Sequence, residues 1–311
     1  MPQVTITLET VTPLFLAGAA PRGAPELRAP AFRGALRYWL RAALGGVIGD
    51  QNMKGLHRLE SAVFGSTKGG SPIHLRLHGS PAWTKAKILP HKEGYQAGER
   101  PAFREGQQFE LQMNLLRSTD AVVWGAACSA LELALAFGGI GLRSRRGYGT
   151  LRIAQCSDPA LVSLSPTTRE GWESHIERVC QRAIAAAQGL AKFYKEQVVP
   201  LPTGPTSFPC ANTLSQIRLT DNGRAGSPGA SSAMDAVTWF MERVPRSPAL
   251  GGINPRQASP LWVRPVLVDG HYELLFLLLP SRLKTGEDYA SVDRFLGRFT
   301  PHKLQVKGWN A

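Results

Sequence analysis

The stretch from residue 138 to residue 150, GGIGLRSRRGYGT, combines two residue types that suit an anion. It contains five glycines and three arginines. Glycine lets the backbone approach a ligand closely, and the guanidinium group of arginine donates paired hydrogen bonds to phosphate oxygens. We therefore predict that the stretch binds phosphate. The candidate residues are Gly139, Gly141, Arg143, Arg145, Arg146, Gly147 and Gly149.

This pattern differs from the phosphate loops that hold nucleotide cofactors. It contains no Gly-Lys-Ser/Thr sequence, and Ser144 stands where a dinucleotide fingerprint has its third glycine. Its expected order is helix–loop–strand, whereas dinucleotide loops run strand–loop–helix because the pyrophosphate sits at a helix N-terminus. The sequence thus predicts no cofactor and favours the phosphates of a nucleic acid. One alternative is a solvated basic loop, which, like an exposed phosphate loop, should contribute little to folding. The other is a loop that shapes the fold, in which case its substitution would lower the melting temperature.

A second set of arginines lies upstream. Arg33, Arg37 and Arg41 recur every four residues in a predicted helix, on a flank clear of its apolar stripe. Arg28, just before Pro30, extends the set. A solvated helix face is the alternative interpretation of this set alone. Two arginine sets in one basic half favour a shared anionic ligand.

Positive charge is concentrated in the first half of the chain. The formal net charge is +13, and residues 1–156 contain 19 Lys and Arg against 10 Asp and Glu, whereas residues 157–311 contain 17 against 13. A basic half indicates an anionic partner. Because no predicted helix pairs a Lys-rich face with a broad apolar face, nucleic acid is favoured over a membrane surface.

The cysteines predict no metal site. They are scattered, and neither CxxC pairs nor Cys/His clusters with zinc-ligand spacing occur. We expect reduced, mostly buried thiols in a cytoplasmic protein. The four are Cys128, Cys156, Cys180 and Cys210.

Hydrophobic periodicity in residues 1–156 predicts the order β-α-α-β-β-α-β, which is the ferredoxin-like arrangement. Trp39 lies on the apolar stripe of the first helix and is predicted to be in the core, and Gly45-Gly46 is read as the signal that ends this helix. The predicted strands are 3–9, 73–79, 109–116 and 151–155, and the predicted helices are 32–44, 55–64 and 121–137.

Residues 157–311 repeat this arrangement less clearly, after a connecting helix and a proline-rich linker. Asp269-Gly270 predicts a hairpin turn, and Pro265 places its first strand at a sheet edge or a bulge. We therefore predict an α+β fold of two tandem ferredoxin-like (RRM-like) domains, 1–156 and 157–311. The predicted helices are 168–197, 231–244 and 289–299, the linker is 199–209, and the strands are 213–219, 261–268, 271–279 and 302–308.

The first predicted sheet offers no platform on which RNA bases could stack. Such a platform needs exposed aromatic side chains on the central strands, but no outward position here is aromatic and two are acidic. RNA should therefore lie on the helix-and-loop side, held by its backbone with little sequence preference. The outward residues are Thr5, Thr7, Glu9, Glu110, Gln112 and Asn114.

Four stretches, taken in order, resemble the RAMP superfamily of CRISPR proteins: VTPLFLAGA, ELRAPAFRGALRYWLR, LESAVFGS and GGIGLRSRRGYGTL. The pattern G-x-G-x-R-x-x-x-G-aromatic-G is complete from Gly139 to Gly149. Within that superfamily the stretches are most similar to the first Cmr subunits of type III-B effector complexes. RQASPLWV at 256–263 also resembles a stretch in the second half of those subunits. Residues 157–255 show no such likeness.

The resemblance implies two RRM-like domains and a role in antiviral defence. A protein of this kind would bind guide RNA, or the guide–target duplex, near the 3′ end of the guide and beside other Cmr and RAMP subunits. The resemblance assigns RNA contact to both arginine sets. We expect the isolated chain to be a monomer.

A metal-independent endoribonuclease that processes CRISPR RNA is the alternative, because some RAMP relatives cleave RNA. Such cleavage needs a general base and a general acid close together. His74 and His78 lie on one predicted strand face, about 13 Å apart by strand rise. The stretch 80–106, where the family's backbone subunits carry a catalytic aspartate, contains no Asp. We therefore expect no catalytic residue.

Overall fold

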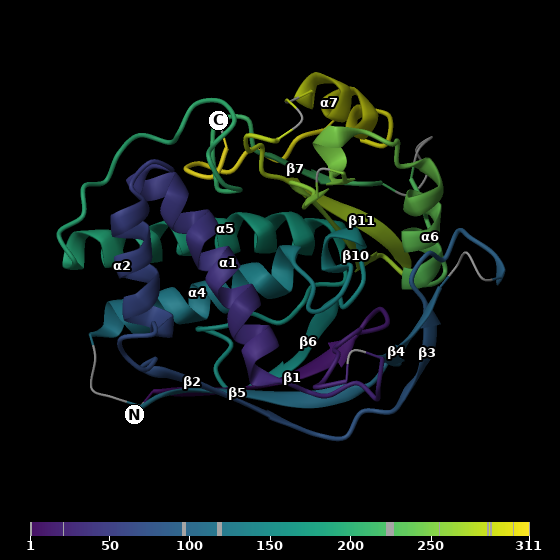
Figure 1. The fold of residues 1–311 in the computed structure, drawn as a ribbon, viewed down its shortest axis with the longest axis horizontal. Helices are drawn as coiled ribbons and strands as arrows, with labels where there is room; N and C mark the ends of the chain where they lie inside the picture. Colours follow the sequence, from purple (N-terminus) through teal and green to yellow (C-terminus); the bar gives the residue numbers. More distant parts are fainter. Residues whose placement is uncertain are drawn as a thin grey trace.

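The protein is an α+β structure with antiparallel sheets (Figure 1). The computed structural model describes residues 2–20, 22–94, 98–116, 120–221, 227–254, 256–284, 286, 288–300 and 302–310. Within these ranges, every helix is too short or too polar to cross a membrane.

The first sheet has four strands in the order β2-β5-β1-β6, and each neighbouring pair is antiparallel. Burial alternates along β1, so that Val4, Ile6 and Leu8 are fully buried while the residues between them are half-buried. The four predicted strands are confirmed. They are β1 (Gln3–Thr10), β2 (Ile73–His78), β5 (Gln108–Leu115) and β6 (Leu151–Cys156).

Four helices pack together on one side of this sheet (Figure 1). The last of them, α5, packs against both α1 and α4 and extends the core away from the sheet. The predicted helices of this half are confirmed, together with the connecting helix. Their bounds are α1 (Ala29–Ile48), α2 (Met53–Phe64), α4 (Ala121–Phe137) and α5 (Arg169–Phe193).

The expected end of α1 at Gly45-Gly46 is wrong, because the helix continues to Ile48. Both glycines are buried, and a Cβ on Gly45 would lie 2.6 Å from the Cβ of Cys210. A Cβ on Gly46 would lie 2.8 Å from that of Ala211. The two glycines therefore serve the close approach of the chain at 210–211 and do not end the helix.

The second sheet has three strands in the order β10-β11-β7. Its hairpin turns at Asp269-Gly270, and Pro265 lies on the edge strand β10, as predicted. The predicted strand 302–308 is wrong, since Leu304 makes only an isolated bridge to Ile217 of β7. The elements are β7 (Gln216–Leu219), α6 (Ala233–Arg243), β10 (Leu261–Val268), β11 (His271–Leu278) and α7 (Tyr289–Gly297).

Two short hairpins lie in stretches that the sequence pattern left without elements. The first contains β3 and β4 within the stretch 80–106, and Ala86, Ile88 and Leu89 of this hairpin pack against the apolar cluster of the second half. The short elements are β3 (Trp83–Lys87), β4 (Glu99–Phe103), β8 (Gly252–Ile253), β9 (Arg256–Gln257) and the 3₁₀ turns η1 (Ser144–Arg146) and η2 (Pro248–Leu250).

The core is continuous between the two halves. Trp39 of α1 is fully buried, as predicted, and its ring lies 5.0 Å from that of Trp262 on β10. The indole N–H of Trp262 donates to the hydroxyl of Tyr38 at 2.8 Å. A domain boundary at residue 156 stays a prediction, since α5, which follows that residue, packs on both α1 and α4.

Replacing Trp39 by alanine should lower the free energy of unfolding by about 3–5 kcal/mol, because it removes a large side chain from a site that cannot collapse. Denaturant unfolding measures this. The control is Trp83→Ala, whose side chain is 47% exposed and which should change stability by less than about 0.5 kcal/mol. Equal stability of the two variants would contradict the packing described for α1.

Candidate nucleic-acid interface

The glycine-rich loop, residues 138–150, is packed into the structure over most of its length. Tyr148 and Thr150 are buried, and only Gly141 and Leu142 are fully exposed. The loop is bonded to the segment that follows β1: Leu142 N donates to Phe15 O, and Gly149 N donates to Pro13 O. The loop is thus one side of a close backbone pair and not a free basic loop.

The glycines are required by this pairing. Gly141 has a φ of +85°, and a Cβ there would lie 2.2 Å from Phe15 O. Gly149 has a φ of +62°, and a Cβ would lie 1.9 Å from Ile140 O. Side chains on Gly139 and Gly147 would also collide with neighbouring atoms. Close packing of protein on protein therefore explains all four glycines without a phosphate.

Arg145 and Arg146 cross from the loop to the second half of the chain. Arg145 donates to Ser259 O, and its guanidinium carbon lies 5.1 Å from the Tyr38 ring centroid and 5.0 Å from that of Trp262. Arg146 donates to Leu250 O, and burial lowers its pKa to about 10. The expectation of an exposed loop that contributes little to folding is wrong at these two residues, since both side chains bond the loop to the second half.

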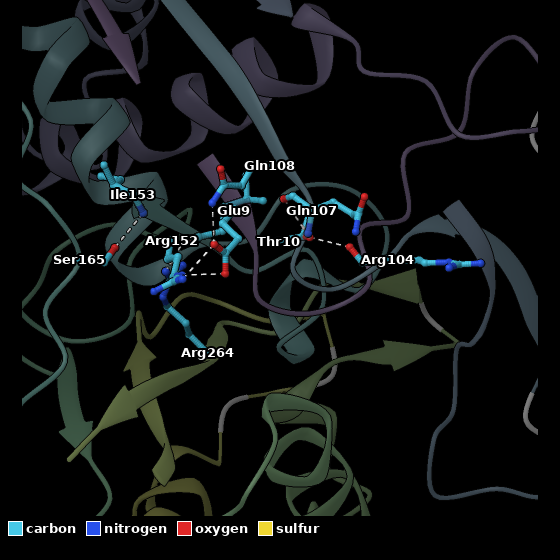
Figure 2. A network of polar contacts seen from close by, with 10 residues as sticks. Glu9, Thr10, Arg104, Gln107, Gln108, Arg152, Ile153, Ser165 and Arg264 are labelled. Carbon is cyan, nitrogen blue, oxygen red and sulfur yellow. Dashed lines mark hydrogen bonds and ion pairs between the residues drawn. The ribbon is translucent and has the colours of Figure 1, made fainter. Parts of the chain in front are cut away.

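A third arginine connects the halves in the opposite direction, from the second half to the loop. Arg264 of β10 is 2% exposed and donates to Gly138 O at 3.0 Å and to Leu151 O at 2.5 Å, the carbonyls at the two ends of the loop. Burial lowers the pKa of Arg264 to about 9. It lines a small cavity of about 30 Å³ between the halves together with Arg152 of β6, and Figure 2 shows both side chains.

Two of the three predicted arginines on α1 are neutralised by one acid. Glu60 of α2, 7% exposed, accepts from Arg37 at 2.5 Å and from Arg41 at 3.0 Å. Arg37 also donates to the carbonyls of Phe64 and Gly65 at the end of α2. These arginines therefore fasten α2 to α1 and keep only part of their positive charge for a ligand.

The remaining predicted arginines are Arg28, Arg33 and Arg143. Arg28 is exposed and donates to Ala17 O at 3.2 Å, while Arg33 and Arg143 make no side-chain hydrogen bond or ion pair within the described residues. The segment after β1 connects Arg28 to the loop tip, because Leu142 N bonds Phe15 O two residues before Ala17. Arg28 and Arg143 therefore flank one stretch of backbone, next to the start of α1.

Residues 7–152, which include both arginine sets, match the model of the RAMP superfamily. We refer to the N-terminal half of this chain, over which the match extends, as the RAMP domain.

Two curated relatives of the RAMP domain come from the CRISPR system of Pyrococcus furiosus. Cmr subunit Cmr1-1 is 32% identical over 174 residues, which are 52% of this chain and 50% of that protein. Cmr subunit Cmr1-2 is 26% identical over 181 residues, which are 49% of this chain and 96% of that protein. The matched part thus spans half the length of the first relative and nearly all of the second.

Solved structures share the fold along the whole chain. The crystal structure of apo Cmr1 from Pyrococcus furiosus superposes with a TM-score of 0.67 at 21% identity, over 99% of this chain and 100% of that chain. A chain of the type III-B Cmr-beta complex bound to cognate target RNA gives a TM-score of 0.59 at 12% identity, over 96% of this chain. The likeness extends beyond the RAMP domain into the second half.

The open face of the RAMP sheet is polar, as predicted. Glu9 accepts two hydrogen bonds from Arg152, both at 2.9 Å, and one from Gln108 at 3.0 Å (Figure 2). These bonds to Arg152 and Gln108 hold the pKa of Glu9 below its usual value. At the end of β1, Thr10 donates to Arg104 O (Figure 2). This face has acidic and amide groups bonded to one another, which gives RNA bases no aromatic surface.

Sequence reasoning missed Glu60 and Arg264, although each left a signal. Glu60 interrupts the apolar positions Leu59 and Val63 of α2, and a charged residue beside such positions indicates a buried partner. Arg264 interrupts the apolar run of β10. Neither signal identifies the partner, because both contacts join segments far apart in the chain.

No residue cluster in the described ranges resembles a metal or acid–base site. Among these residues no group of three His, Cys, Asp or Glu side chains is placed to hold a metal ion. Three cysteines are buried and Cys156 is half-buried. His91 is the one histidine near the predicted arginines. Burial and the neighbouring Lys92 and Arg143 lower its pKa.

Replacing Arg145 and Arg146 together by alanine should destabilise the protein by about 3 kcal/mol, because two charge-assisted hydrogen bonds between the halves are lost. Paired lysines should recover little, since lysine lacks the planar fork that reaches the carbonyls and stacks on the rings. Thermal and denaturant unfolding measure both variants. As a control, Arg22→Ala with Lys68→Ala removes the same charge from exposed positions. Unfolding curves that match the wild type for the Arg145 and Arg146 pair would refute the proposed contacts.

Proposed function

We propose that this chain is an RNA-binding subunit of a type III-B CRISPR effector complex, and that it holds guide RNA or the guide–target duplex near the 3′ end of the guide. The observation that carries the proposal is the likeness to Cmr1: one Cmr1 protein is 32% identical over 174 residues, and a Cmr1 structure shares the fold along 99% of the chain. The positive charge of the RAMP domain and its unpaired arginines support it. Its partners would be guide RNA, target RNA and other Cmr subunits, with the isolated chain a monomer.

We infer further that both halves are ferredoxin-like units in tandem. In the RAMP domain the strands follow each other as β2-β5-β1-β6. In the second half the order is β10-β11-β7, and Leu304 takes the place beside β7 that β6 takes beside β1. A second ferredoxin-like unit, with the same order of strands and helices as the RAMP domain and a last strand shortened to the bridge at Leu304, would produce the strand order of the second half.

Within the RAMP domain, we assign the principal RNA contacts to Arg28, Arg33 and Arg143. Arg28 donates to Ala17 O alone, and Arg143 makes no side-chain hydrogen bond within the described residues. The terminal guanidinium nitrogens of Arg33 are also without a partner in the described part of the chain, whereas its Nε atom is buried. Phosphate oxygens accept such donors well. For Arg37, Arg41, Arg145 and Arg146 contact with RNA stays a prediction, because each already donates to protein oxygens. Contacts to phosphate carry no sequence information, so binding should be largely indifferent to sequence.

We propose that the chain holds RNA without cleaving it. The proposal rests on the stretch 80–106, which contains no Asp where the family's backbone subunits carry a catalytic one. One histidine of this stretch nevertheless has features of a general base. His91 has a buried Nδ1 atom without a hydrogen-bond partner, and its lowered pKa keeps it neutral at pH 7 as a general base would have to be. An endoribonuclease would therefore work through His91, and RNA labelled at one end and incubated with the protein distinguishes the two functions.

Affinity purification of a tagged copy from its native host tests the assembly directly. Small RNA and several other subunits should elute with the chain, and RNA in the eluate should share guide sequences. Elution of the chain alone, at salt concentrations that leave other complexes intact, would overturn the proposal. Cleavage of the labelled RNA, resistant to EDTA and lost in His91→Ala, would instead establish the endoribonuclease.

Replacing Arg28 and Arg143 by alanine should lower the affinity for single-stranded RNA of every sequence about equally. Each phosphate contact releases condensed counterions, so the log–log salt slope should flatten by about 0.7 per contact, or about 1.4 for the pair. Fluorescence anisotropy with labelled RNAs of equal length and different sequence, from low to high salt, gives affinity and slope together. A hundredfold preference of the wild type for one sequence, or an unchanged slope in the variant, would contradict the assignment.

A further inference from the structure

The second half of the chain contains an open basin of about 470 Å³ between the ends of α6 and α7. The ring of Phe276 on β11 lies 5.7 Å from that of Phe240 on α6, and the Phe240 ring lies 6.2 Å from that of Phe295 on α7. The end of α6, the segment after it and one side of α7 form the walls. None of the residues that line this basin belongs to the RAMP domain.

Four arginines surround the basin: Arg243, Arg246, Arg294 and Arg298. All four side chains are exposed. Arg243 stacks on the Trp239 ring at 4.5 Å and pairs with Glu242 at 3.2 Å. The other three guanidinium groups make no hydrogen bond or ion pair with any residue in the described ranges. Positive charge is therefore denser around this basin than the net charge of residues 157–311 suggests.

One acid lines the basin, and it is already engaged. The carboxylate of Asp288 accepts a hydrogen bond from Ser291 N at 3.0 Å and so caps the start of α7. That bond to Ser291 lowers the pKa of Asp288. Three unpaired guanidinium groups thus face a hollow with a single lining carboxylate, which is the electrostatic setting of an anion site.

The floor of the basin is apolar. Val292 and Phe295 of α7, with Leu250 and two prolines of the segment 245–250, line it. A hollow with apolar floor and arginine rim fits a phosphate ester whose sugar or base lies on the floor while its phosphate meets the rim. An acidic peptide would use the rim but leave the apolar floor unfilled, so a nucleic acid strand fits both features better.

The glycine-rich loop fixes one wall of this basin. Arg146 donates to the carbonyl of Leu250, which is a lining residue, and its guanidinium carbon lies 6.0 Å from the Phe240 ring centroid. The wall therefore keeps its place only while the loop is docked on the second half. Arg146 is a positioning residue for the basin and lies outside it.

We propose that this arginine-lined basin binds the phosphodiester backbone of a single RNA strand, as a second RNA site separate from the arginines of the RAMP domain. The proposal rests on the proposed RNA-binding function and adds a site in the half of the chain that has the lower net charge. Arg294 and Arg298, one turn apart on α7, contact successive phosphates, and Arg246 closes the rim from the opposite wall.

The test compares two double variants of the full chain in RNA-binding titrations. Arg294→Ala with Arg298→Ala should lower the affinity for single-stranded RNA on the order of tenfold at moderate salt. It should also flatten the log–log salt dependence of the affinity by about 1.4. The matched control, Lys54→Ala with Lys192→Ala, removes the same charge from exposed positions on α2 and α5 that do not line the basin. The control should retain the affinity and slope of the wild type.

The other outcomes separate this proposal from the function on which it rests. The basin proposal fails and the RNA-binding function stands if the variant with Arg294→Ala and Arg298→Ala binds RNA like the wild type while the variant with Arg28→Ala and Arg143→Ala binds it more weakly. If the wild type binds no RNA, both fail. If adenosine monophosphate binds in an Arg294- and Arg298-dependent way but RNA affinity is independent of them, the basin is a free-nucleotide site and the proposal is overturned. Loss of a Cmr subunit from the purified complex, with RNA affinity unchanged, assigns the basin to a protein partner instead.

Discussion

The two halves of this protein depend on an exchange of arginine donors at the glycine-rich loop. Arg264 of the second half donates to the carbonyls at both ends of the loop, and Arg145 and Arg146 of the loop donate to carbonyls of the second half. Burying a guanidinium group costs free energy, as the lowered pKa values of Arg146 and Arg264 reflect. The cost is offset because every buried cation has peptide oxygens as acceptors, which stabilise it more than a neutral donor would.

This exchange explains why the loop is rich in glycine as well as in arginine. The carbonyls can face the second half only if the loop lies flat against the segment after β1, where a Cβ at Gly141 or Gly149 would collide with backbone oxygens. The arginines can then extend in one direction, toward β10 and η2. One sequence pattern thus encodes a joint between two packed units, although its composition alone equally suits a phosphate loop.

The sequence predicted most elements because their signals are local. The strict alternation of β1 and the apolar stripe with Trp39 on α1 need only one face to be buried. The sequence did not predict contacts between distant segments. The chain at 210–211 packs closely on Gly45 and Gly46 within α1, and Glu60 forms ion pairs with two of the arginines assigned to RNA. Residue type singled out these arginines as a group, but their division into paired and unpaired members depends on partners that spacing cannot reveal.

That division changes how the charge of this protein acts on RNA. A paired arginine still adds to the long-range field that draws an anion to the surface, because its charge is only partly cancelled. Direct contact needs a donor that no protein oxygen occupies, and Arg33, Arg143 and the α7 arginines have such donors. The RAMP domain therefore has fewer contact sites than its net charge implies, whereas the less basic second half has more. Arg145, Arg146 and Arg264 join the two halves, so under the proposed function the same three arginines set the stability of this joint and the position of the two RNA-contacting sets relative to each other.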